Sequence, residues 1–98
     1  MNVFISGGSR GIGRDTVLKF AAEGWGVAFT YAGNSAAAEE TVRLAAEKAP
    51  GVKVKAYQLD VKDPGAVESV VEEAIADFDE IAALVNNAAV VRNNAAVM

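Results

Sequence analysis

Short apolar runs alternate with amphipathic stretches along the whole chain. The runs are rich in Val, Ile, Phe and Tyr, which is typical of β-strands, and the stretches between them repeat apolar residues with a period near 3.6, which is typical of helices. The expected strands are Val3–Ile5, Trp25–Tyr31, Val52–Leu59 and Ile81–Val85. The expected helices are Gly11–Glu23, residues 36–49 and a third that begins at Pro64.

Each predicted helix has an apolar face, which we expect to pack on a sheet. In the first helix this face is formed by Ile12, Thr16 and Phe20, with Val17 and Ala21 beside them. In the second helix it consists of Ala38, Val42, Ala45 and Ala49. In the third helix it consists of Val67, Val70, Val71, Ala74 and Phe78.

Residues with capping and turn-forming side chains predict where the helices begin and end. Asp63 is expected to cap the third helix, with Pro64 at its first position. Ser35 is expected to cap the second helix, because its hydroxyl can accept a backbone N–H at the helix start. Gly24 is expected to end the first helix, and Pro50-Gly51 the second.

Strands that alternate with helices predict an α/β fold built from parallel β-α-β units. We expect a three-layer, Rossmann-like, doubly wound parallel sheet with strand order 3-2-1-4, which stops after its fourth strand. Residues 1–98 are expected to form one domain. The third strand carries Lys53 and Lys55 on one face, which suits an exposed edge.

Composition excludes several function classes. The net charge is −4 and no basic stripe is present, so nucleic acid is not expected as a partner. The sequence has no cysteine for disulfides and no histidine, the commonest metal ligand, and we expect no metal site. No apolar run approaches the length of a membrane span, and no signal-peptide pattern precedes the first strand. We therefore expect a cytoplasmic protein without a membrane partner.

A glycine-rich stretch, Ser6 to Arg14, follows the first strand and leads into the first helix. Gly7 permits a positive φ at the tight turn, and Gly11 lacks a Cβ, so that a pyrophosphate could approach the backbone. Gly13 would allow the helix to lie near its strand. The N–H groups at a helix start carry partial positive charge, so this context predicts a phosphate-binding loop.

Two other interpretations of this loop are possible from the residues alone. A tight glycine turn with no ligand would use the same residues. A P-loop would also place Gly8 and Gly13 at this spacing, but Arg14-Asp15 stands where Lys and Ser or Thr are needed. Hydrolysis of a nucleoside triphosphate is therefore not expected.

Three segments together resemble the short-chain dehydrogenase/reductase family. They are Ser6-Gly7-x-x-x-Gly11-Ile12-Gly13, Asp60-Val61 and Asn86-Asn87-Ala88-Ala89. Within the family, Ser-Arg-Gly-Ile-Gly-Arg, Leu-Val-Asn-Asn-Ala and Arg92-x-Asn94 are most similar to 3-oxoacyl-acyl-carrier-protein reductases, enzymes of fatty acid biosynthesis. The resemblance extends over essentially the whole chain but covers only the first part of a family subunit.

The resemblance implies a dinucleotide-binding domain and NADP(H)-dependent reduction of a small-molecule carbonyl substrate to a secondary alcohol. The residues expected at the cofactor are Gly7, Gly8, Ser9, Arg10, Gly11, Ile12, Gly13, Tyr31, Asp60, Val61, Asn86, Asn87 and Ala88. NADP(H) is preferred over NAD because the segment that begins at Tyr31 has no carboxylate to repel a 2′-phosphate, and Arg10 offers a charged fork to it. Asn34 and Ser35 could add contacts to the phosphate or form an ordinary turn.

Asp60 has three possible roles at the end of the third strand. By resemblance, its carboxylate accepts the adenine amino group and Val61 supplies apolar contact. Alternatively, Asp60 caps the following turn. An aspartate here is also the phosphorylation site of receiver domains, but those need an acidic pair after the first strand, where this chain has Ser6-Gly7.

The asparagines after the fourth strand are expected to connect it to its neighbours and to line the cofactor ribose. They could equally satisfy buried backbone groups of the loop. Ala89 departs from the glycine of the family motif, and a positive φ there would cost about 1 kcal/mol.

No catalytic residue is expected in this chain. The Ser, Tyr and Lys of the family's reductases follow its fourth strand, and neither Tyr31 nor Tyr57 precedes a lysine by four residues. Two hypotheses remain: the cofactor-binding part of a complete reductase, or a free-standing nucleotide-binding or interaction module without catalysis. In either case the apolar fourth strand predicts self-association through its edge if nothing else covers it.

Overall fold

The computed structural model describes residues 1–7, 11–60 and 62–86, and within them strands and helices alternate as the pattern predicts. The strands are β1 (Asn2–Ser6), β2 (Gly26–Tyr31), β3 (Val54–Gln58) and β4 (Ala83–Asn86). The helices are α1 (Gly11–Ala22), α2 (Ser35–Lys48) and α3 (Pro64–Phe78). None of the helices in these ranges is long and apolar enough to span a bilayer.

The strands form one parallel sheet in the order β3-β2-β1-β4, which confirms the predicted topology. In the register of the sheet, Val3 of β1 lies between Val27 of β2 and Ala83 of β4. At the other end of these strands Ser6 pairs with Asn86, and Tyr31 of β2 pairs with Gln58 of β3. The carboxyl ends of the parallel strands therefore lie at the same end of the sheet.

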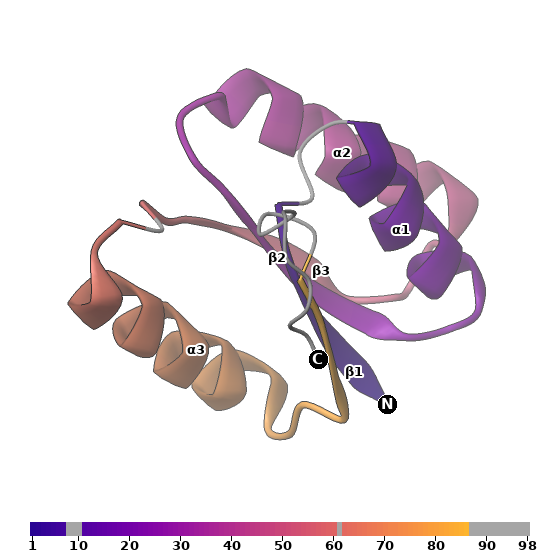
Figure 1. Cartoon of the computed structure of the whole chain (residues 1–98). Coiled ribbons are helices and arrows are strands. Elements are labelled where there is room, and N and C mark those ends of the chain that lie inside the picture. Colours follow the sequence, from indigo (N-terminus) through magenta and orange to yellow (C-terminus); the bar gives the residue numbers. More distant parts are fainter. Residues whose placement is uncertain (8–10, 61, 87–98) are drawn as a thin grey trace.

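Helices cover both faces of the sheet, which gives the expected three layers (Figure 1). Helices α1 and α2 lie on one face, and α3 lies on the other. The core under α1 and α2 contains Val3, Ile5, Val17, Ala21, Val27, Phe29, Ala38 and Ala45. The core under α3 contains Phe4, Ala28, Tyr57, Leu59, Val70, Ala74 and Phe78.

Helix α1 is rotated relative to the face expected from its sequence. Its buried residues are Gly13, Val17 and Ala21, which are spaced four apart along one side. Ile12 is 77% exposed and does not join the core. The reason is that Gly13, with no side chain, permits close contact between the helix start and the sheet, and Ile12 is then directed away from it. The apolar faces predicted for α2 and α3 do contact the core.

The helix caps confirm one expectation and correct another. Asp63 caps α3, since its Oδ1 accepts the backbone N–H groups of Gly65 and Ala66, and Pro64 is the first helical residue. Ser35 does not cap α2; it is the first residue of the helix. Asn34 is the cap, and its side chain accepts the N–H of Ala37 at 2.9 Å.

Strand β4 is an edge of the described sheet. Leu84, which pairs with Phe4 of β1, is 72% exposed. Strand β3 is the opposite edge, as predicted from its lysines. Self-association through β4 stays a prediction.

Candidate cofactor-binding site

The candidate site lies at the end of the sheet that is formed by the carboxyl ends of the strands. Strand β1 is in the middle, between β2 and β4. The chain leaves β1 through α1 on one face of the sheet, and it enters β4 from α3 on the other face (Figure 1). The carboxyl ends of β1 and β4, where the helix connections change from one face of the sheet to the other, are the point at which doubly wound sheets bind ligands.

Two glycines of the loop have backbone conformations that favour glycine. Gly7 has a φ of 80°, as expected, and Gly11 has a φ of 61° at the first position of α1. A Cβ built on Gly11 would meet no atom within 4 Å, so its conformation, and not crowding by the protein, requires glycine there. Gly13 is buried, consistent with close packing of α1 on the sheet. Gly8, Ser9 and Arg10 lie outside the described residues.

Side chains from β2 and β4 hold the start of this turn. The N–H of Gly7 donates to Oγ1 of Thr30 at 3.0 Å, and the Ser6 hydroxyl donates to Oδ1 of Asn86 at 2.8 Å. The second bond confirms that Asn86 connects β4 to its neighbour. Sequence reasoning missed Thr30, whose only signal was a hydroxyl inside an otherwise apolar strand. Asn87, Ala88 and Ala89 lie outside the described residues.

The first turn of α1 contains no acidic side chain, so no carboxylate of its own neutralises its partial positive charge. Its one charged residue, Arg14, is directed to α2. There Nε donates to Oγ1 of Thr41 at 2.9 Å and Nη2 donates to the carbonyl of Ala37 at 3.0 Å. Arg14 therefore connects the start of α1 to α2 through hydrogen bonds. Its position in a glycine motif did not predict this role.

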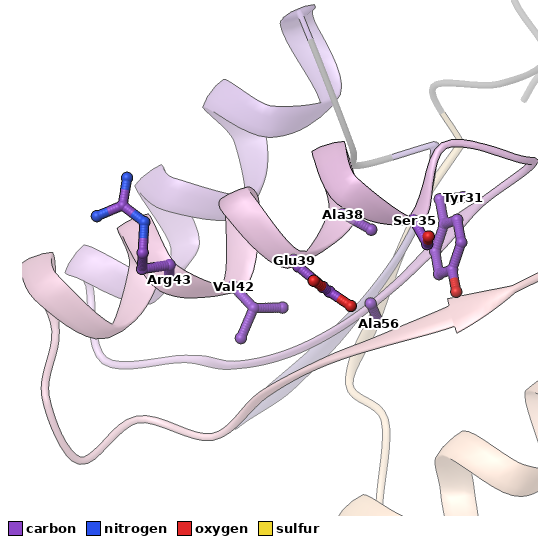
Figure 2. A pocket seen from close by; sticks show the side chains of 7 residues that line it. All are labelled: Tyr31, Ser35, Ala38, Glu39, Val42, Arg43 and Ala56. Atoms are coloured by element: carbon purple, nitrogen blue, oxygen red, sulfur yellow. The ribbon is translucent and has the colours of Figure 1, made fainter.

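A shallow hollow lies between α2 and the ends of β2 and β3 (Figure 2). Tyr31 and Ser35 lie next to each other at one end of it, and Arg43 lies at the other. Arg43 forms ion pairs with Glu40 and Glu47 along α2, and its hydrogen bond to Glu40 lowers the pKa of that carboxyl. The remaining lining residues are Ala38, Glu39, Val42 and Ala56.

Asp60 performs the turn-capping role that was one of its alternatives. Its Oδ1 accepts the backbone N–H of Lys62 at 3.0 Å. A carboxylate has further acceptor capacity, so this bond is compatible with contact to adenine, which stays a prediction. Val61 lies outside the described residues.

Tyr57 is buried, and its hydroxyl has a partner on α3. Its hydroxyl donates to Oδ2 of Asp77 at 2.5 Å, on the α3 side of the sheet. Burial, followed by this hydrogen bond, raises the pKa of the phenol, so that proton release is disfavoured. Among the described residues, no group of three or more His, Cys, Asp or Glu side chains could hold a metal ion.

The sequence matches the family model of the short chain dehydrogenases over residues 1–97. The chain belongs to the short-chain dehydrogenase family. The 3-oxoacyl-[acyl-carrier-protein] reductase FabG of Staphylococcus aureus is 40% identical over 93 residues, which are 95% of this chain and 37% of that protein. An NADP-dependent mannitol dehydrogenase of Aureobasidium melanogenum is 42% identical over 81 residues, which are 83% of this chain and 30% of that protein.

Solved structures of short-chain dehydrogenases have the same fold. One from Serratia marcescens has a TM-score of 0.85 and 40% identity, over 91% of this chain and 36% of that one. A levodione reductase has a TM-score of 0.80 and 30% identity, over 85% of this chain and 32% of that one. The chain therefore spans about a third of the length of these relatives.

The described residues fit a nicotinamide dinucleotide. The positive φ angles of Gly7 and Gly11 reverse the chain between β1 and α1, and the open space at Gly11 leaves room for a ligand at the helix start. No carboxylate follows Tyr31 before α2 begins, and Glu39 of α2 lines the same hollow as Tyr31.

Proposed function

We propose that this chain is the NADP(H)-binding part of a short-chain oxidoreductase that reduces a carbonyl to a secondary alcohol, similar to 3-oxoacyl-acyl-carrier-protein reductases. The observation that carries the proposal is the glycine turn between β1 and α1, in which Gly7 and Gly11 have a positive φ, beside the carboxyl ends of β1 and β4. The names of the relatives support both the reaction class and the use of NADP.

In this proposal the N–H groups at the start of α1 bind the pyrophosphate, with the loop glycines allowing close approach. Asn86 and the neighbouring Asn87 and Ala88 line the nicotinamide half, and Asp60 with Val61 holds the adenine. When bound, the cofactor supplies a hydride to the carbonyl carbon. The chain's own residues orient the cofactor.

The preference for NADP(H) rests on the surroundings of the 2′-phosphate. The side chain of Asn34 is engaged as the cap of α2, so it is not the group that we assign to the phosphate. Tyr31 and Ser35 lie side by side at one end of the hollow, which Glu39 also lines, and no carboxylate stands between Tyr31 and the start of α2 (Figure 2). Arg10 then supplies the positive charge.

The test compares NADPH with NADH. Replacing Arg10 with Ala should weaken the binding of NADPH by at least about tenfold, the cost of losing one charge-assisted hydrogen bond. The affinity for NADH should change by less than about twofold. Lys19→Ala, which removes a positive charge from the last turn of α1, is the matched control and should affect neither. Equal losses for NADPH and NADH in Arg10→Ala would contradict the assignment of Arg10.

A second candidate is a binding module without catalysis. The engagement of Tyr57 by Asp77 favours it, because that tyrosine cannot replace the missing catalytic phenol. The two functions differ in turnover: the binding module would bind NADPH but oxidise none of it with any ketone, even as the complete protein. Turnover by the complete protein would exclude the module.

A further inference from the structure

Thr30 extends the contact between β1 and β2 beyond the end of their backbone ladder. The last paired residues of these strands are Ile5 and Phe29. Past that pair, the hydroxyl of Thr30 replaces a backbone carbonyl and accepts the N–H of Gly7 at 3.0 Å. Thr30 is 2% exposed, on a strand whose neighbouring positions are apolar, so its hydroxyl is a specific exception within the core.

This hydrogen bond fixes the orientation of the first peptide group in the glycine turn. Gly7 has a φ of 80°, and a glycine has unusual conformational freedom that a bond to a rigid neighbour removes. The bond also engages the Gly7 N–H, so that group is directed to Thr30 and not to a ligand. The part of the turn that follows Gly7 then begins from a fixed peptide orientation. Less conformational entropy is lost when a ligand binds, which favours binding.

We propose that Thr30 is a positioning residue for the phosphate-binding turn, acting through the backbone N–H of Gly7. The inference rests on the proposed function, because it assigns a pyrophosphate to the turn. Thr30 itself contacts no part of the ligand in this account. Its removal should therefore weaken ligands that carry a pyrophosphate and leave other ligands of the site largely unchanged.

The experiment measures dissociation constants of the purified protein for three probes: NADPH, ADP-ribose and adenosine 2′-phosphate. The first two contain a pyrophosphate, and the third does not. Thr30→Val keeps the shape of the side chain and removes the acceptor. It should weaken the binding of NADPH and ADP-ribose by about fivefold to tenfold, the effect of one hydrogen bond, and the binding of adenosine 2′-phosphate by less than about twofold. Thr30→Ser, which keeps the hydroxyl, should restore binding.

Matched variants separate positioning from a general loss of stability. Tyr57→Phe removes another buried hydroxyl, one that donates to Asp77 on the α3 side of the sheet and not to the turn, and it should lower the Tm without the selective loss. Thr30→Ala, measured with the same probes, replaces Thr30→Val if the valine variant does not fold.

Three results would overturn the inference. They are equal losses for all three probes, unchanged affinities in a variant without the hydroxyl, and the same selective loss in Tyr57→Phe. If the wild-type protein binds none of the probes, the proposed function fails as well. Binding by the wild type with no selective loss in the Thr30 variants rejects only the role of Thr30.

Discussion

The starts of the three helices differ in how their backbone N–H groups are satisfied. Helices α2 and α3 have caps of their own, Asn34 and Asp63, whose side chains accept the first free N–H groups. Helix α1 instead begins at Gly11 with a φ of 61°, and the residue before it is Arg10, a side chain with no acceptor.

We propose that this difference separates structural helix starts from a binding one. Capping residues in the chain stabilise α2 and α3 without a ligand. The residues directly before α1 lie outside the described ranges, but the side chain of Arg10 has no acceptor, and the positive end of α1 is in this proposal the one that takes an anion.

The largest effect is expected when α1 receives a negative charge of its own. Ile12 lies in the first turn and is 77% exposed, so Ile12→Asp should fold without difficulty. Its carboxylate would repel the pyrophosphate and weaken the binding of NADPH by about thirtyfold relative to Ile12→Asn, which has the same shape without the charge. Titration calorimetry of the two variants measures the difference. Equal affinities would mean that no anion binds at this helix start.

A smaller effect is expected from the backbone of Gly11. Gly11→Ala forces a side chain into the left-handed region and should lower the free energy of unfolding by about 1–2 kcal/mol. Gly33→Ala is the control, because its added Cβ also meets no atom and its φ is not positive. Chemical denaturation of both variants tests the comparison. A Gly11→Ala variant as stable as Gly33→Ala would show that the turn does not need the left-handed conformation.

The smallest effect on binding is expected at α3. Asp63→Ala removes the cap and should lower the free energy of unfolding by about 1 kcal/mol. NADPH affinity should stay within about twofold of the wild type, because this cap has a structural role. Thermal unfolding and calorimetry on the same sample measure both quantities. A large loss of affinity would mean that α3 contributes to the site directly.

Features decided by neighbouring residues in the sequence were predictable. The pair Asp63-Pro64 defines its helix start locally, and the positive φ of Gly7 follows from a tight turn between strand and helix. The choice between Asn34 and Ser35 as cap was not decided locally, because both side chains can accept an N–H. It depends on where α2 begins in the folded chain.

Features that depend on distant residues were not predictable. Thr30 contacts Gly7 across 23 residues of sequence, and Arg14 contacts Thr41 across 27. The first contact exists only after β1 and β2 have paired, and the second only after α1 and α2 have packed together. The outward direction of Ile12 has the same origin, since the buried side of α1 is set by how closely Gly13 approaches the sheet.

The central claim is that a dinucleotide phosphate binds at the start of α1 and not at the other helix starts. Titration of the ¹⁵N-labelled protein with NADP⁺, followed by amide chemical shifts, tests it most directly. We predict saturable shifts at Gly11, Ile12 and Gly13, with little change at Gly65 and Ala66 of α3. A folded protein whose α1 amides do not shift with NADP⁺ would contradict the account.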